Sequence, residues 1–223
     1  MTTQEKLETF MNIVKDSVVK TECPFKLEDM FIAGGCIRSL TELEEIKDID
    51  IFFRKNVEAD KVKAYFKEYL PDSFITENAV SITLEGMKYQ FVLTQQGEPL
   101  EIVNEFDFTM NMNYFDFHNK QTYIHDLTSI VTKRLKINLK CRNKLSTLAR
   151  IHKFVERGYK IPSRLNLIEL GVQLTQQKSV VKFEELQESS KLYFSRSDYD
   201  NISTVDNSNS YDDIIRNYKG SAV

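Results

Sequence analysis

Two aspartates alternate with isoleucine in the stretch D-I-D-I-F-F, which covers residues 48–53. Side chains two residues apart on a β-strand project from the same face, so Asp48 and Asp50 would lie side by side there. Two neighbouring carboxylates repel each other, and a divalent cation relieves that repulsion. Mg²⁺ prefers carboxylate oxygens combined with substrate phosphates over a cage made only of protein groups. The pair therefore predicts a magnesium site, and the alternative is an ordinary solvated strand face.

A glycine pair precedes this strand in the stretch F-I-A-G-G-C-I-R, residues 31–38. Gly34 and Gly35 follow an apolar run and come just before a helical pattern. Glycine lets backbone N–H groups approach a phosphate closely, and the N-terminus of a helix favours anions. Arg38 falls in the first turn of the expected helix, from which it could reach a triphosphate. The pattern indicates a phosphate-binding turn, and the alternatives are a plain turn and a surface arginine.

A third acidic residue, Asp107, lies between two phenylalanines in the stretch F-D-F-T, residues 106–109. If Phe106 and Phe108 face the core of the protein, Asp107 faces the other way and can join the first two carboxylates. The alternative is an aspartate on an edge strand, or one that caps the following turn.

Hydrophobic periodicity predicts the elements that would hold these residues in place. Helices are expected where apolar residues recur every three or four positions, and strands where they alternate. Pro71 follows the helical pattern at 57–70, and a proline commonly ends a helix. Gly86 indicates a hairpin turn. In chain order, the expected elements are a helix at 3–20, a strand at 31–33, a helix at 36–43, a strand at 48–53, a helix at 57–70, a β-rich hairpin region at 74–94, and short strands at 100–103, 106–108 and 122–124.

The chain changes character near residue 126, where the pattern becomes helical and basic as far as residue 160. Two further helices are expected within residues 162–192, and a flexible tail rich in Ser, Asn and Asp begins near residue 195, with a short helix at 211–218. The simplest architecture is an α+β fold. It comprises a small mixed β-sheet flanked by helices in a head at residues 1–130, a helical neck at 131–194 and the tail at 195–223.

The composition limits the class of protein. A chain of 223 residues with 41% hydrophobic and 28% charged residues is typical of a soluble globular protein with a sizeable core. The net charge of −3 excludes a global attraction to nucleic acid, so any such surface must be local, as in the basic run from Lys133 to Lys160. The three cysteines are widely spaced, which argues against a zinc site or a disulfide framework. No signal peptide or long apolar span is visible, so we expect a cytoplasmic protein without membrane contact.

Taken together, these motifs resemble the DNA polymerase β-like nucleotidyltransferase superfamily. The closer resemblance is to the head and neck of class II tRNA CCA-adding enzymes and bacterial poly(A) polymerases, in a minimal form of the kind carried by bacteriophages. The matching segments are G-G-C-I-R-S at 34–39, K-D-I-D-I at 47–51, D-F-T-M-N at 107–111, and the neck segment A-R-I-H-K-F at 149–154 with Gly158 and Tyr159.

The resemblance implies roles for individual residues. The catalytic residues would be Asp48, Asp50 and Asp107, of which Asp48 and Asp50 would hold Mg²⁺, either one ion or two. Asp107 would contact either the ribose or the metal, and the sequence leaves both roles open. The nucleotide would be bound by Gly34, Gly35, Arg38, Asp107, Asn111, Arg150 and Lys153.

The chain also departs from the family pattern. The family's E-D-x-x-R motif, which selects the base, would fall on Asn143, Lys144 and Thr147 and is absent. The two arginines that precede the family's D-F-T segment are replaced by Glu105 and Phe106. These departures argue against synthesis of a CCA end.

The resemblance implies Mg²⁺-dependent transfer of a nucleoside monophosphate from an NTP such as ATP to an acceptor hydroxyl, with release of pyrophosphate. Positioning and charge neutralisation would supply most of the catalysis. The first acceptor to consider is an RNA 3′ end, such as that of a tRNA, because of the basic run. A protein or a small molecule is the second acceptor. A non-catalytic module that keeps the fold and binds RNA or a protein is the third hypothesis.

Overall fold

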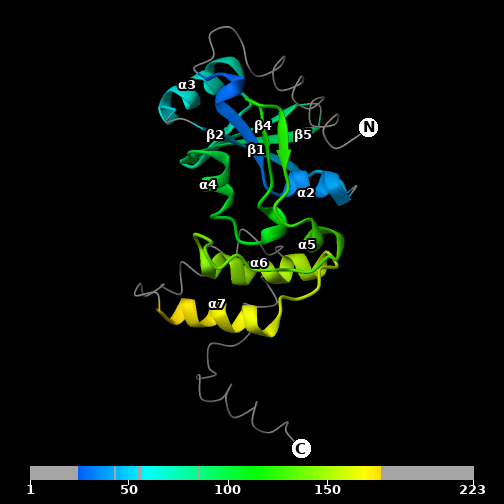
Figure 1. Cartoon of the computed structure of the whole chain (residues 1–223). Helices are drawn as coiled ribbons and strands as arrows, with labels where there is room; N and C mark the ends of the chain where they lie inside the picture. The colour runs from blue at the N-terminus through cyan, green and yellow to red at the C-terminus, as the bar shows by residue number, and fades with distance from the viewer. Residues whose placement is uncertain (1–24, 43, 55–56, 85, 177–223) are drawn as a thin grey trace, which may run out of the picture.

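The computed structural model describes residues 25–42, 44–54, 57–84 and 86–176 (Figure 1). The helix expected at 3–20, the tail from residue 195 and the short helix at 211–218 lie outside these residues. Within the described part of the chain, no helix is both long and apolar enough to cross a membrane.

A seven-stranded mixed sheet forms the head, with the strand order β3-β4-β5-β2-β1-β6-β7. β2 and β5 are parallel, and the other neighbours in the sheet are antiparallel. The mixed sheet with its helices confirms the α+β fold that the sequence predicts. The strands are β1 (Met30–Ala33), β2 (Asp48–Phe53), β3 (Phe74–Ile75), β4 (Ala79–Leu84), β5 (Met87–Gln96), β6 (Tyr114–Asp116) and β7 (Gln121–Tyr123).

Helices cover the sheet and continue into the neck below it (Figure 1). The helices are the 3₁₀ turn η1 (Leu27–Asp29), α2 (Gly35–Glu42), α3 (Ala59–Tyr69), α4 (Pro99–Val103), the 3₁₀ turn η2 (Thr109–Asn111), α5 (Leu127–Val131), α6 (Lys144–Glu156) and α7 (Arg164–Gln176). In Figure 1, α6 and α7 lie one below the other beneath the sheet.

The alternation of β2 decides which way its aspartates face. Ile49, Ile51 and Phe53 belong to the main core, where they pack with residues of α2 and α3. The opposite face carries Asp48, Asp50 and Phe52, and Phe52 packs in a smaller cluster with residues of α4. Because side chains of a strand alternate between its faces, burying the isoleucines against α2 and α3 places both carboxylates on the other side.

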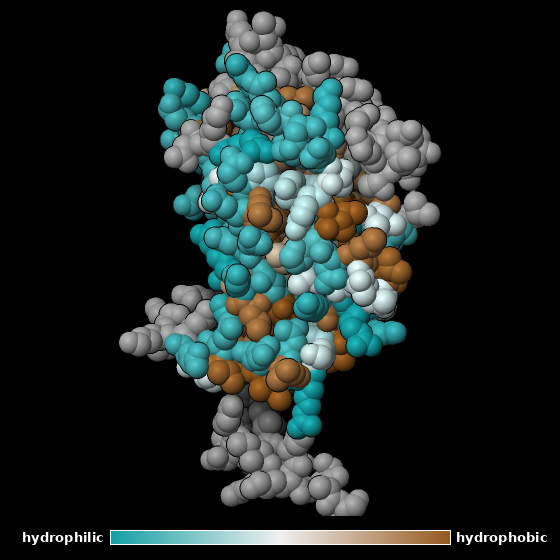
Figure 2. Space-filling model, in the orientation of Figure 1, coloured by the Kyte–Doolittle hydropathy of each residue, from teal (hydrophilic) through white to brown (hydrophobic). Residues whose placement is uncertain are grey.

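The neck has a core of its own. Phe108, Met110 and Ile137 pack there with Ile151 and Phe154 of α6 and with Leu170 of α7. α7 also exposes apolar side chains, namely those of Leu165, Ile168 and Val172. Figure 2 shows apolar side chains at the surface of the part of the molecule where α6 and α7 lie.

Several sequence predictions are confirmed and others are wrong. The strands at 31–33, 48–53 and 122–124 and the helices at 36–43 and 57–70 are present within two residues of their predicted bounds. The strand predicted at 100–103 is instead helix α4, because Pro99 begins it and Glu98 and Glu101 form a capping box. β6 was not predicted. Of the two helices expected within 162–192, α7 is present, and residues beyond 176 are not described.

The strand predicted at 106–108 is also wrong. Phe106 packs beside Phe52 of the head, whereas Phe108 packs against Phe154 of the neck, with ring centroids 5.8 and 5.1 Å apart respectively. The two phenylalanines thus enter different cores. Similarly, the helical pattern at 126–160 is interrupted between α5 and α6, where Leu135 and Ile137 are buried two residues apart in an extended segment.

Candidate active site

The two aspartates of β2 lie at the wall of a cavity between head and neck. Asp48 is exposed and Asp50 is half-buried. Burial and then the neighbouring Asp48 carboxylate raise the pKa of Asp50 from 3.8 to about 7. Burial disfavours the charged form of a carboxyl group, and a second carboxylate on the same strand face adds to this effect.

The glycine turn brings the chain from β1 to α2 beside these carboxylates. Gly34 has a φ of +94°, and its N–H donates to the carbonyl of Asn113 at 2.9 Å. A Cβ atom on Gly34 would lie 3.5 Å from the Phe106 ring and 4.0 Å from Asp50 Oδ2. A Cβ atom on Gly35 would meet nothing within 4 Å, so the backbone of Gly35 borders open space at the start of α2.

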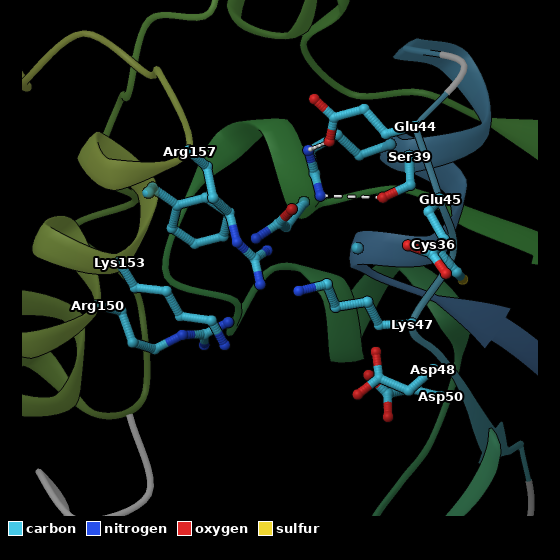
Figure 3. A pocket seen from close by; sticks show the side chains of 14 residues that line it. Cys36, Ser39, Glu44, Glu45, Lys47, Asp48, Asp50, Arg150, Lys153 and Arg157 are labelled. Atoms are coloured by element: carbon cyan, nitrogen blue, oxygen red, sulfur yellow. Dashed lines mark hydrogen bonds and ion pairs between the residues drawn. The ribbon is translucent and has the colours of Figure 1, made fainter. Parts of the chain in front are cut away.

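A cationic face of α6 forms the opposite wall. Arg150, Lys153 and Arg157 are spaced three and four residues apart, which places them along one side of a helix. Figure 3 shows their side chains reaching from the neck towards Lys47, Asp48 and Asp50. Burial, and then the nearby cations of Arg157 and Arg150, lower the pKa of Lys153. The wall therefore concentrates positive charge where an anion would neutralise it.

Two adjoining cavities share the residues Gly35, Asp50, Asn111 and Arg150. The first has a volume of about 460 Å³ and is also lined by Arg38, Lys47, Asp48, Lys153 and Arg157. The second has a volume of about 340 Å³ and is also lined by Gly34, Phe106, Asp107, Arg142 and Asn143. Both cavities are lined by charged groups, and the second also offers the aromatic ring of Phe106.

Asp107 lies against the neck. Its Oδ2 is 2.7 Å from Arg150 Nη1, and its Oδ1 accepts a hydrogen bond from the Phe108 N–H at 3.0 Å. Burial raises the pKa of Asp107, although Arg150 opposes this shift. Among the described residues, no three acidic, histidine or cysteine side chains are grouped so that they could hold a metal ion. The structure therefore does not place Asp107 in a three-carboxylate metal group with Asp48 and Asp50.

Asn111, in η2, has a side chain that faces both cavities. It is 4% exposed, and its Oδ1 has no hydrogen-bond partner among the described residues. Buried polar atoms are nearly always paired, so this acceptor is suited to a hydrogen bond from a ligand.

Arg38 lies at the edge of the first cavity and is 3% exposed. Its Nη1 donates to Glu42 at 2.5 Å, to Glu44 at 3.0 Å and to the Tyr159 hydroxyl at 2.8 Å. The guanidinium that the sequence predicts as a triphosphate ligand is thus engaged in protein contacts.

The positions of the missing base-selecting motif have local structural roles. Asn143 caps α6 by accepting a hydrogen bond from the Ser146 N–H at 3.0 Å. Thr147 is fully buried, and its hydroxyl donates to the Asn143 carbonyl at 2.8 Å. These two side chains are used within the first turn of the helix.

The structure brings all of the residues predicted from the sequence to one or both cavities. It adds Lys47 and Arg157 to the first cavity and Arg142 to the second, none of which was assigned a role from the sequence. The spacing of Arg157 from Arg150 and Lys153 would have indicated a shared helix face. Lys47 belongs to the segment K-D-I-D-I and Arg142 to the basic run, but neither pattern assigns these residues to a cavity.

The donor set suits Mg²⁺. Two carboxylates are available on one strand face, and the facing wall carries the cations of Arg150, Lys153 and Arg157. Two protein carboxylates completed by phosphate oxygens are a common arrangement for this ion.

Comparison with known proteins gives a family and a fold. The family model described as "Gabija anti-defense 2 family protein" matches residues 1–131. The protein "Gabija anti-defense 2" of Bacillus phage SPbetaL7 is 30% identical over 173 residues, which is 73% of this chain and 41% of that protein. The chain thus spans about two fifths of the length of this curated relative.

Solved structures of larger proteins share the fold. A CCA-adding enzyme with CTP has a TM-score of 0.54 and 15% identity, and the alignment covers 75% of this chain and 43% of that one. A Thermotoga maritima CCA-adding enzyme complexed with tRNA has a TM-score of 0.50 and 15% identity, with 73% and 41% covered. A tRNA nucleotidyltransferase complexed with a primer tRNA and an ATP analog has a TM-score of 0.50 and 16% identity, with 73% and 52% covered. At this identity the likeness shows the fold alone.

Proposed function

The chain belongs to the Gabija anti-defense 2 family, and on this premise we propose that it is a magnesium-dependent nucleotidyltransferase that counteracts a bacterial defence. The reaction would transfer a nucleoside monophosphate from an NTP to an acceptor hydroxyl. One observation carries the proposal: Asp48 and Asp50 face the cations of α6 across a cavity that begins at the Gly35 turn.

In this proposal the phosphates of the NTP lie in the first cavity. The open backbone at Gly35 and the side chains of Lys153 and Arg157 would contact the phosphates. The bound Mg²⁺, held by Asp48 and Asp50, would neutralise phosphate charge and activate the attacking oxygen. The acceptor hydroxyl would release its proton to solvent as its oxygen forms a bond to the α-phosphorus. The bond from the α-phosphorus to the bridging oxygen of the β-phosphate would break, and pyrophosphate would leave.

The base and ribose would occupy the second cavity. Its half-buried Phe106 offers an aromatic face, the Asp107 carboxylate lines it, and the Asn111 Oδ1 acceptor lies at its junction with the first cavity. The side-chain oxygens of Asn143 and Thr147 already form hydrogen bonds within the first turn of α6, so we assign no base contact to these atoms.

We place the acceptor within the defence system, as a protein hydroxyl. The support is the description of the family as Gabija anti-defense. A second candidate acceptor, an RNA 3′ end, is favoured by the exposed cations Arg134, Lys136, Lys140, Arg142 and Lys160 on the neck. Such cations can contact phosphates of a nucleic-acid backbone.

A labelling experiment tests both the activity and the acceptor. The purified protein is incubated with Mg²⁺ and α-phosphate-labelled NTPs in lysates from cells with and without the Gabija defence. Label on a protein band only in the first lysate supports the proposal, and label that ribonuclease removes supports the RNA candidate. Binding of NTP without any transfer of label would indicate the non-catalytic hypothesis.

Two variants make this experiment specific. Asp50→Asn is expected to lower transfer at least 100-fold, a loss of about 2.7 kcal/mol of transition-state stabilisation. Asp72→Asn, which changes an exposed aspartate outside both cavities, is the matched control and should transfer label as the wild type does. Equal transfer by Asp50→Asn and the wild type would contradict the proposed site.

A further inference from the structure

The arginine that follows the glycine turn is part of a partly buried network, which we name the head–neck latch. The latch consists of Arg38, Glu42, Glu44, Lys133 and Tyr159. Arg38 and Glu42 lie on α2 of the head, and Tyr159 follows α6 of the neck. The Arg38 guanidinium joins the two parts through the 2.8 Å hydrogen bond from Nη1 to the Tyr159 hydroxyl, across 121 positions in the sequence.

The other members of the latch close the network around this bond. The Tyr159 hydroxyl donates to Glu42, and Lys133 Nζ lies 2.9 Å from Glu44 and 3.8 Å from Glu42. The Tyr159 ring also lies 5.6 Å from the Arg38 guanidinium and 5.7 Å from Lys133 Nζ. Burial, and then the hydrogen bond to Glu42, raise the pKa of Tyr159, so its hydroxyl stays protonated and can donate.

The backbone explains how Tyr159 reaches α2. Gly158 has a φ of +83°, in the left-handed region that often ends a helix. The N–H of Gly158 donates to the Val155 carbonyl and that of Tyr159 to the Phe154 carbonyl, at 2.9 and 3.0 Å. The chain thus turns back at the end of α6 and presents the Tyr159 side chain to Arg38.

The same end of α6 carries cations of the first cavity. Lys153 lies in the last turn of α6, and Arg157 is the residue that caps its C-terminus, shortly before Tyr159. The orientation of α6 therefore sets where these two cations stand relative to Asp48 and Asp50. Arg38 cannot contact a phosphate through Nη1 without giving up bonds to buried partners, because this nitrogen already has three acceptors.

We infer that Arg38 is a positioning residue, which holds α6 against the head through Tyr159 and so fixes the cationic wall of the nucleotide cavity. That this wall serves an NTP rests on the proposed function. The inference differs from the role predicted from the sequence, in which Arg38 itself contacts the triphosphate.

Three variants separate the two roles of Arg38. Tyr159→Phe keeps the ring and removes the hydroxyl that links the head to the neck. Arg38→Lys keeps the charge but cannot form the same set of hydrogen bonds. The third variant combines both substitutions. Tyr123→Phe is the matched control, because its hydroxyl contacts His125 and neither residue lines the two cavities.

The first readout is the dissociation constant of the Mg²⁺ complex of whichever NTP the wild type binds most tightly, measured well below the unfolding temperature. If Arg38 acts by positioning, Tyr159→Phe, Arg38→Lys and the double variant each weaken binding by a similar factor of about ten, and Tyr123→Phe binds within twofold of the wild type. If Arg38 contacts phosphate, Tyr159→Phe binds within twofold of the wild type while Arg38→Lys is weakened. That second pattern would overturn the inference.

The second readout needs no nucleotide. Hydrogen exchange of the α6 amides should become about ten times faster in Tyr159→Phe, while exchange in β2 and β5 stays unchanged. Unchanged exchange in α6 overturns the latch, and so does faster exchange with unchanged NTP affinity, which indicates a merely structural contact. A wild type that binds no NTP would overturn the proposed function, and the exchange data would still decide for or against the latch.

Discussion

At the scale of single residues, the chemistry of the site depends on charges that oppose one another. The carboxyl group of Asp50 has a pKa of about 7 in the fold against an ordinary value of 3.8. At a pH between these two pKa values, the folded protein binds more protons than the unfolded chain does. The metal-free protein should therefore lose stability through this group as the pH rises from about 4 to above 7.

We accordingly predict that Mg²⁺ stabilises the protein more at pH 8.5 than at pH 6. At the higher pH the Asp50 carboxylate is ionised, so a cation relieves more repulsion and meets no competing proton. Thermal unfolding with and without MgCl₂ at both pH values measures this difference. Asp50→Asn should remove the dependence of the Mg²⁺ effect on pH, and an equal shift at both pH values in the wild type would contradict the prediction.

The ion pair between Asp107 and Arg150 supports a second prediction. Arg150→Gln leaves a buried carboxylate without its partner, and because Arg150 is 30% exposed the expected loss of stability is about 1–3 kcal/mol. The loss should be larger at pH 8 than at pH 5, where Asp107 can take up a proton. Urea unfolding without nucleotide measures the change.

The control for this prediction is a pair on the surface of the same helix. Glu156→Gln breaks the exposed His152–Glu156 contact of 3.1 Å and should cost less than about 1 kcal/mol. If Arg150→Gln were no more destabilising than Glu156→Gln, the buried pair would contribute nothing to the joint between head and neck.

At the scale of elements, the turn between β1 and α2 offers two adjacent glycines with different constraints. The φ of +94° at Gly34 is strained for any L side chain, so Gly34→Ala should cost roughly 1–2 kcal/mol of stability. Gly35 has open space beside it, so Gly35→Ala should leave stability nearly unchanged. A methyl group there would instead occupy the space proposed for phosphate.

The two alanine variants should therefore affect different properties, one the binding of NTP and the other the stability of the fold. We predict that Gly35→Ala weakens NTP binding at least tenfold while keeping the wild-type unfolding temperature, whereas Gly34→Ala lowers that temperature. Calorimetric binding and thermal unfolding of the same samples separate the effects. Unaltered NTP affinity in a folded Gly35→Ala variant would argue against a phosphate at this turn.

At the scale of the whole molecule, the cavities border the main core of the sheet, the smaller cluster around Phe52 and the core of the neck. The first cavity is lined by β2 and α2 on one side and by α6 on the other. A ligand that fills it must therefore contact both parts. If the proposed nucleotide binds there, its binding and the docking of head and neck should be mutually dependent.

We predict that Mg²⁺ and a saturating NTP protect α6 from hydrogen exchange as well as β2. A ligand at 100 times its Kd should raise the free energy of unfolding by about 2.7 kcal/mol if head and neck unfold together. Hydrogen exchange with and without the ligand tests this expectation. Protection confined to the head would show that the nucleotide does not reach the neck.

Much of the fold could be predicted because its signals are local. The D-I-D-I-F-F alternation places Asp48 and Asp50 on one face of β2, and burial of the isoleucines decides which face. The order of the elements from β1 to α3, and the β-rich region that follows them, also agrees with apolar spacing. The errors at 100–103 and 106–108 arose where capping residues, or burial in two different cores, override a short apolar pattern.

The sequence by itself determined the carboxylate pair, the glycine turn and an α+β head followed by helices, because each depends on neighbours within a few positions. Only the tertiary structure placed Arg157 and Lys47 in the cavity, set Asp107 against Arg150, and joined Arg38 to Tyr159. These contacts form between residues far apart in the chain. The packing of the head against the neck determines which of these residues meet, and the periodicity of the sequence does not reveal such pairs.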